Sequence, residues 1–160
     1  MGMKAGKILG SWLALALITV AAQAADPVDF SGTWILNTDK GQNLGMVSAI
    51  QETLVVTQTE TNLDQAFTDV FNGNTTTRSV SYDLAGGAVT NYAAMGEQSE
   101  TVSTWDGVSL VTTWTSEGAI AGTTVVKTET RWLSDDGKSM SVESSRGDRP
   151  SMIMVYDRQE

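Results

Sequence analysis

The amino-acid sequence predicts an all-β fold, an antiparallel up-and-down meander closed into a barrel of about eight or nine strands. Runs of alternating or β-branched residues recur along the chain, and clusters of Gly, Asp and Asn separate them. No segment has the periodicity of a long amphipathic helix. Short turn signals join successive runs, which indicates neighbouring antiparallel strands. Closing the sheet on itself buries one face of every strand.

The first 24 residues are expected to form a signal peptide that precedes this fold. A basic start, the mostly apolar run Ile8–Val20 and the small-x-small pattern Ala22-Gln23-Ala24 are typical of exported proteins. The apolar run is shorter than the roughly 20 residues that a membrane-spanning helix needs, which argues against the alternative of an uncleaved anchor. We therefore expect cleavage after Ala24, export to a periplasm or to the extracellular space, and a single domain over residues 25–160.

Nine strands are expected, in order, near residues 30–37, 52–59, 63–71, 76–84, 99–105, 108–115, 123–133, 138–145 and 151–158. A short turn of helix is expected over residues 44–50. Asp106-Gly107 and Asp135-Asp136-Gly137 are tight-hairpin signals, because glycine readily adopts positive φ, and residues 145–150 form a third hairpin loop. The irregular stretch 85–98 leaves open a further short strand around residues 89–92.

Side chains alternate between the two faces of a strand, so parity identifies the residues expected inside the barrel. Most strands are expected to turn their even positions inward. The third strand is expected to shift to odd positions, which places Gln65 and Asp69 on its apolar inner face, although a register one residue away would place both in solvent. In the strand near 123–133, even positions are expected inside, and the residues expected to face solvent are Lys127, Glu129 and Arg131.

Composition argues against several functional classes. The chain has 10 Lys and Arg against 19 Asp and Glu, and without the two leader lysines the formal balance is 8 − 19 = −11. Such a surface disfavours nucleic acids, which require clustered basic residues, and no integral membrane insertion is expected. The absence of Cys and His removes disulfides, thiolate metal sites and the usual general base near neutral pH. No phosphate loop or metal-ligand spacing occurs, so no metal and no cofactor is expected.

The segment "FSGTWILN" contains Gly32-Thr33-Trp34, which resembles the Gly-x-Trp signature that opens the first strand of lipocalins and related calycin barrels. Together with the late "SDDGKSM" and the terminal "VYDR", it is similar to small exported bacterial lipocalin-like domains of unassigned function. The resemblance implies that Trp34 packs across the closed end of the barrel, with an arginine near the end of the last strand stacked over it. Arg158 occupies that place, and Arg131 is the alternative candidate for the arginine that stacks over Trp34. Gly32 allows the indole or another backbone to approach closely.

The expected function is that of an exported soluble barrel that binds a small apolar or amphipathic molecule in its interior. A barrel of eight strands has room for side chains or for one small ligand, and methionines with aromatic rings form adaptable pockets. Two alternatives stay open: a small enzyme that uses a buried carboxylate or tyrosine, Asp69 or Tyr156, and a structural or interaction domain with a filled core. No catalytic residue is assigned. The predicted ligand-binding residues are Thr112, Trp114, Thr128, Trp132, Met140, Met152, Met154 and Tyr156.

Overall fold

The computed structural model describes Gly2 and residues 27–160. Apart from Gly2, the predicted signal peptide and its cleavage site lie outside the described residues. The strands are β1 (Gly32–Leu36), β2 (Gln51–Gln58), β3 (Asn62–Phe71), β4 (Asn74–Asp83), β5 (Ala88–Tyr92), β6 (Gln98–Asp106), β7 (Ser109–Glu117), β8 (Thr124–Leu133), β9 (Ser139–Ser145) and β10 (Met152–Arg158).

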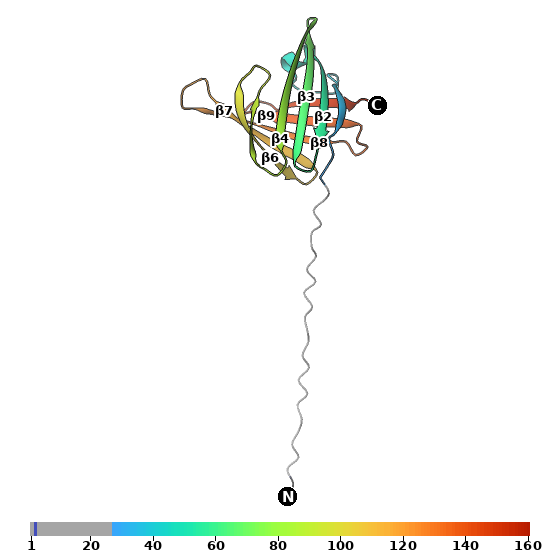
Figure 1. Cartoon of the computed structure of the whole chain (residues 1–160), viewed down its shortest axis with the longest axis vertical. Coiled ribbons are helices and arrows are strands. Elements are labelled where there is room, and N and C mark those ends of the chain that lie inside the picture. The colour runs from blue at the N-terminus through green and yellow to red at the C-terminus, as the bar shows by residue number, and fades with distance from the viewer. Residues whose placement is uncertain (1, 3–26) are drawn as a thin grey trace.

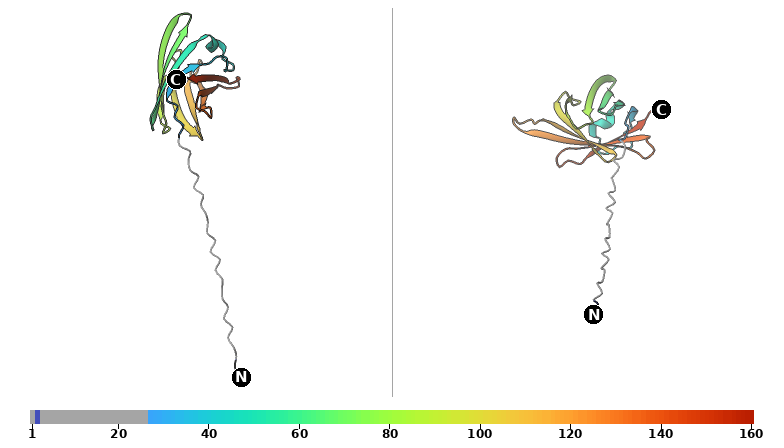
Figure 2. Two further views of the ribbon diagram at one scale, coloured as in Figure 1. Left: turned by 90° about the vertical axis from the view of Figure 1, so that its right-hand side faces the viewer. Right: turned by 60° about the horizontal axis from the view of Figure 1, so that its bottom comes forward.

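All strands belong to one antiparallel sheet that curls into a nearly closed barrel (Figure 1). Its spatial order is β4-β3-β2-β1-β10-β9-β8-β7-β6-β5, so the two ends of the sheet are β4 and β5. Figure 2 shows the sheet folded over, with the strands β2 to β4 facing β8 to β10. The predicted antiparallel meander is confirmed.

The strand count differs from the prediction, because the sheet has 10 strands rather than eight or nine. The additional strand is β5, within the stretch 85–98 that reads as irregular in the sequence. Its sequence, AVTNY, is short and partly polar, so it lacks the strong alternation that marks the other strands. Between β1 and β2 lies the 3-10 helix η1 (Gly45–Ala49), within the range expected for a helical turn. Among the described residues, no helix is long and apolar enough to span a membrane.

The ends of the sheet are joined by a side chain. The Asn91 amide of β5 accepts a hydrogen bond from the Ser81 backbone N–H at 3.0 Å and donates one to the Ser81 carbonyl at 2.7 Å. It thereby replaces the pair of bonds that a neighbouring strand would make with Ser81 of β4. The same amide donates to Thr101 Oγ1 of β6 at 2.7 Å. This seam, defined by Asn91 and Ser81, is where the barrel closes.

Trp34 fills one end of the barrel. The indole is fully buried and donates its Nε1 hydrogen to the Phe30 carbonyl at 3.0 Å. The Arg158 guanidinium lies over the ring, 4.1 Å from its centroid, and donates to the Ser31 carbonyl at 2.7 Å. Gly32 permits this stack, since its φ is 141° and a Cβ there would lie 2.6 Å from Arg158 Nη1. The structure thus pairs Trp34 with Arg158 and places Arg131 elsewhere.

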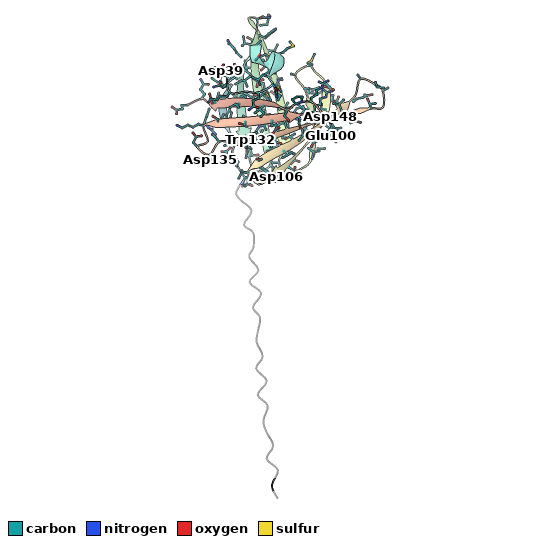
Figure 3. The ribbon with its side chains drawn as sticks, turned by 180° about the vertical axis from the view of Figure 1, so that it is seen from behind. Asp39, Glu100, Asp106, Trp132, Asp135 and Asp148 are labelled. Carbon is teal, nitrogen blue, oxygen red and sulfur yellow. The ribbon has the colours of Figure 1, made fainter. Side chains whose placement is uncertain are left out.

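The orientation predicted for β8 is wrong. Leu110 and Trp114 of β7, which are both buried, pair directly with Arg131 and Lys127, so the odd residues of β8 share the inner face. A shift of one residue reverses every side chain of a strand. Thr128 and Trp132 therefore point away from the interior, and Figure 3 views the side of the sheet that carries Trp132.

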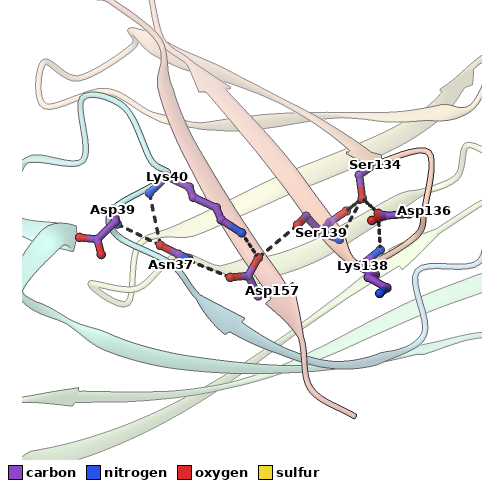
Figure 4. A network of polar contacts seen from close by, with 8 residues as sticks. All are labelled: Asn37, Asp39, Lys40, Ser134, Asp136, Lys138, Ser139 and Asp157. Atoms are coloured by element: carbon purple, nitrogen blue, oxygen red, sulfur yellow. Dashed lines mark hydrogen bonds and ion pairs between the residues drawn. The ribbon is translucent and has the colours of Figure 1, made fainter.

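A polar network on the outside of the barrel fixes the segment that follows β1 (Figure 4). The Asp157 carboxylate of β10 accepts hydrogen bonds from Lys40 Nζ at 2.7 Å, Asn37 Nδ2 at 2.7 Å and Ser139 Oγ at 3.1 Å. Lys40 and Asn37 are the main reasons why the pKa of Asp157 lies below its ordinary value. The network links the end of β1 to β9 and β10.

Candidate ligand-binding cavity

The barrel encloses a cavity of about 210 Å³. Its walls come from β2, β3 and β4 on one side and from β7 to β10 on the other, with the η1 segment and the loop before β6 at one end. The lining is mixed, since apolar and aromatic side chains alternate with charged ones. The cavity is lined by Val47, Ile50, Glu52, Leu54, Gln65, Phe67, Asp69, Arg78, Tyr82, Ala93, Ala94, Trp114, Lys127, Glu129, Arg131, Val142, Met152, Met154 and Tyr156.

A second hollow of about 270 Å³ adjoins this cavity and shares four of its lining residues, Ala93, Ala94, Trp114 and Lys127. Sites for small molecules usually measure about 300–1,000 Å³. The cavity together with the adjoining hollow therefore has room for a small ligand. The shared residues mark the end of the barrel where the two spaces meet.

The structure brings together half of the predicted ligand-binding residues. Those that line the cavity are Trp114, Met152, Met154 and Tyr156. Met140 is fully buried in the packed core instead. Thr112 faces inward but shares a hydrogen bond of 2.8 Å with Ser103, and the prediction for Thr128 and Trp132 was wrong because β8 is turned over. Gln65 and Asp69 lie on the inner face, as the odd parity of β3 predicted.

The sequence reasoning missed most of the charged lining. The cavity walls carry three acidic and three basic side chains: Glu52, Asp69, Glu129, Arg78, Lys127 and Arg131. A signal was present in β8, where Lys127, Glu129 and Arg131 alternate in sign at the period of one strand face. Neighbouring charges of opposite sign can neutralise one another inside a barrel, whereas we expected these three side chains to face solvent.

Glu52 is the centre of a buried ionic cluster. Its carboxylate accepts a hydrogen bond of 2.6 Å from the Tyr156 hydroxyl and one of 3.0 Å from Arg78 Nη2. Arg78 Nε also lies 3.6 Å from an oxygen of Asp69, and its guanidinium lies 3.4 Å from the centroid of the Phe67 ring. Glu52, Asp69, Arg78 and Tyr156 will be called the Glu52 cluster.

Protonation within the Glu52 cluster follows from burial. Burial raises the pKa of Glu52 to about 7, and the neighbouring Asp69 adds to this effect, while the Tyr156 hydrogen bond and Arg78 oppose it. Burial and the Glu52 carboxylate raise the pKa of Tyr156 well above its ordinary value. Tyr156 therefore remains a hydrogen-bond donor, and Glu52 exchanges a proton near neutral pH.

Arg131 stands apart from that cluster. Its side chain is 4% exposed, and Nη2 donates to Gln65 Oε1 at 3.3 Å. The Phe30 and Tyr82 ring centroids lie 5.9 and 5.6 Å from its Cζ atom. Within residues 27–160, no carboxylate oxygen lies within the 4.0 Å limit of an ion pair with Arg131. Burying a charge without a partner is costly, so Arg131 is an unusual residue for a packed core.

Four buried polar atoms around the cavity have no hydrogen-bond partner among the described residues: Gln65 Nε2, Arg131 Nε, Arg78 Nε and Asp69 Oδ1. All four side chains line the cavity. Most buried polar groups in proteins are paired, and each one left unpaired costs about 1–3 kcal/mol. Three of these atoms are donors and one is an acceptor, so the cavity offers polar contacts of both kinds to a bound molecule.

Lys127, Glu129 and Trp114 form a third polar group beside the adjoining hollow. Glu129 accepts hydrogen bonds from Lys127 Nζ at 2.8 Å and from Trp114 Nε1 at 3.1 Å. Lys127 Nζ also lies 4.2 Å from the centroid of the Trp114 ring, a favourable cation–π geometry. In contrast to Arg131, these charges satisfy one another.

No protein-family model matches the chain, and no curated protein matches it in sequence. Solved structures do match its fold. The chain is similar to fatty-acid-binding protein 1 of Echinococcus granulosus, with a TM-score of 0.63 and 16% identity over 82% of this chain and 98% of the other. It is also similar to a Schistosoma mansoni fatty-acid-binding protein in complex with arachidonic acid (TM-score 0.64, 15% identity, 82% and 96% covered). The chain is similar to human cRBP IV as well, with a TM-score of 0.62 and 14% identity over 83% of this chain and 100% of the other.

At these identities the likeness shows the fold alone. The chain has the nearly closed β-barrel of these neighbours, so the expected antiparallel barrel is confirmed, whereas membership of the calycin group stays a prediction. Kinship with exported bacterial lipocalin-like domains stays a prediction.

Proposed function

We propose that this protein binds a small amphipathic molecule inside the barrel, with an acceptor-bearing polar group directed at Arg131 and Gln65. The observation that carries the proposal is the Arg131 guanidinium, which is buried without a carboxylate partner among the described residues. Its Nε and the neighbouring Gln65 Nε2 are donors without acceptors. A carboxylate or another acceptor group of a ligand would pair with both of them.

The apolar part of the ligand would lie against the rest of the lining. Leu54, Phe67 and Val142 contribute apolar surface from three strands, and Met152 and Met154 contribute flexible thioethers. Methionine adapts to ligands of different shape because its side chain is unbranched. The fold neighbours support this arrangement, since several of them are fatty-acid-binding proteins and one was solved with arachidonic acid.

Fluorescence titration with straight-chain fatty acids tests the proposal, because Trp114 lines the cavity. We expect saturable quenching, and we expect Trp114→Phe to lose most of this signal. Arg131→Met should weaken binding about tenfold or more, since hydrogen bonds to a charged group contribute about 1.5–3 kcal/mol. Arg149→Met, in the exposed β9–β10 hairpin, is the matched control and should bind like the wild type. A flat response across the panel, or equal binding by Arg131→Met, would contradict the proposal.

Arg131→Met also separates function from folding. Replacing a buried charge by an apolar side chain of similar length is often neutral or stabilising. We therefore expect the variant to unfold at the same urea concentration as the wild type or at a higher one, while it loses affinity for the ligand. A large loss of stability would instead indicate a structural role for Arg131.

We further propose that the protein acts outside the cytoplasm after removal of its leader. The support is the basic start, the apolar run and the small-x-small pattern that ends at Ala24. Mass spectrometry of the protein from a cell fractionation should give a mature chain that begins at Ala25. A chain that keeps its first residues and stays with the cytoplasmic fraction would contradict this.

A further inference from the structure

The polar groups of the cavity lie in two places of opposite charge, the positive Arg131 and the negative Glu52 cluster. Their separation indicates which class of ligand the function proposed above would involve. At Arg131 and Gln65 the unpartnered atoms are donors. At the Glu52 cluster one acceptor, Asp69 Oδ1, and one donor, Arg78 Nε, are unpartnered, and this donor lies 3.6 Å from the other oxygen of Asp69. Gln65 and Asp69 are four residues apart on the same face of β3, which corresponds to about 13 Å along the strand.

In the Glu52 cluster a single arginine faces two carboxylates, so one negative charge is left without a positive partner. Glu52 and Asp69 are direct cross-strand neighbours on β2 and β3, and Arg78 is the arginine that contacts both. With both carboxylates ionised, this group of three has a net charge of −1. Two carboxylates held side by side in a buried site repel each other unless a proton or another cation joins them.

The hydrogen bonds of the cluster show where a cation would bind. Both oxygens of Glu52 already accept, one from Tyr156 and one from Arg78. Asp69 differs, because Oδ2 lies 3.6 Å from Arg78 Nε and Oδ1 has no partner in the described part of the chain. Since Arg78 Nε already faces Asp69 Oδ2, the negative charge left without a partner at this end of the cavity is at Asp69 Oδ1. It is the counterpart of the donor at Gln65, a residue that is 1% exposed.

We propose that the pair Glu52 and Asp69 binds a protonated amine of the ligand, so that the preferred ligand is an amphiphile with an amine at one end and an acceptor group, such as a carboxylate, at the other. The amine supplies the positive charge that the Glu52 cluster lacks and donates to Asp69 Oδ1. The acceptor group pairs with Arg131 and Gln65. This inference rests on the proposed function and adds a second point of recognition to it.

A proton on Glu52 competes with the amine, because either one neutralises the same excess charge. The groups that face Glu52 are Asp69 from β3, Arg78 from β4 and Tyr156 from β10, while Lys127 and Glu129 of β8 line the same cavity as a neutral pair. Since burial raises the pKa of Glu52 to about 7, amine binding should strengthen as the pH rises through 7. Binding at pH 7 should also release protons.

The test compares octanoic acid, octylamine and 8-aminooctanoic acid in calorimetric titrations at pH 8, with six- and twelve-carbon homologues to match the length of the cavity. We expect the best amino acid of this series to bind at least about tenfold more tightly than the fatty acid of equal length. Asp69→Asn should abolish this advantage, so that the amino acid and the fatty acid of equal length bind the variant alike. Asp64→Asn, on the outer face of the same strand, is the matched control and should keep the advantage.

A second measurement keeps the inference testable if Asp69→Asn folds poorly. Wild-type titrations at pH 7 in buffers of different ionisation enthalpy report the protons released on binding, and we expect release with the amino acid and none with the fatty acid. Binding of the fatty acid without any gain from the amine, or a gain that survives Asp69→Asn, would overturn this inference alone. Failure of all three ligand types to bind would overturn the proposed function and this inference with it.

Discussion

Replacing Glu52 by Gln tests the electrostatics of the barrel interior. Burial raises the pKa of Glu52 to about 7 from an ordinary value of 4.5. Between these two pH values the folded protein holds a proton that the unfolded chain has released. The free energy of unfolding contributed by this group therefore falls as the pH rises from 4.5 through 7, and Glu52→Gln removes this dependence.

The magnitude follows from the two pKa values. One pH unit corresponds to about 1.4 kcal/mol, so the displacement from 4.5 to about 7 corresponds to about 3 kcal/mol. Relative to Glu52→Gln, the wild type should lose about 3 kcal/mol of unfolding free energy between pH 4.5 and pH 8. The glutamine retains an oxygen that can accept from the Tyr156 hydroxyl, so this hydrogen bond survives the substitution.

Urea denaturation followed by tryptophan fluorescence, repeated at several pH values between 4.5 and 8, measures the effect. Glu60→Gln is the control, because this exposed residue lies in the turn between β2 and β3. Its difference from the wild type should not vary with pH in the same way. A constant difference between wild type and Glu52→Gln across the range would refute the reasoning, since Glu52 would then titrate at its ordinary pKa in the folded protein.

Three further substitutions test the packing of the barrel. Gly32→Ala should lower the unfolding free energy by about 1–3 kcal/mol in urea, because the φ of 141° suits glycine and the new methyl group would meet a guanidinium nitrogen at 2.6 Å. Asn91→Ala should speed hydrogen exchange of the Ser81 amide, which loses its acceptor at the seam; unchanged exchange would show that the seam closes without the amide. Thr112→Val should cost about 1–3 kcal/mol by leaving the Ser103 hydroxyl unpaired, and the double variant with Ser103→Ala should recover part of it.

Local sequence pattern accounts for most of the meander. The hairpin glycines Gly107 and Gly137 have φ values of 59° and 67°, which is the conformation that the turn signals require. β5 could not be assigned with the same certainty, because its buried residue is a polar one, Asn91. The partners that make this burial favourable lie on β4 and β6, and a local pattern contains no information about them.

The reversal of β8 has a different cause. Parity was assigned on the assumption that charged side chains face water, which holds for most strands. In β8 the charged side chains face the interior, where Lys127 pairs with Glu129 on the same strand and Arg131 donates across the barrel to Gln65 of β3. The positions where the rule fails are those that line the cavity.

The Glu52 cluster could not be predicted from the sequence because its members lie far apart along the chain. Glu52 and Tyr156 are separated by 104 residues, and they meet because β2 and β10 both flank β1. Tyr156 itself was predicted inside the barrel from its parity. Glu52 has the same even parity as Leu54 and Val56, but it was not counted as an interior residue because it is charged.

The pairing of β1 with β10 places the first and the last strand in the middle of the sheet and not at its margin. The Gln159 N–H donates to the Thr33 carbonyl at 2.8 Å, so the last residues run beside the first strand. A rearranged gene that linked the end of β10 to the start of β1 and began at β5 would encode the strands in the order in which they stand in space. The architecture is therefore well suited to circular permutation, with the new termini on either side of the seam.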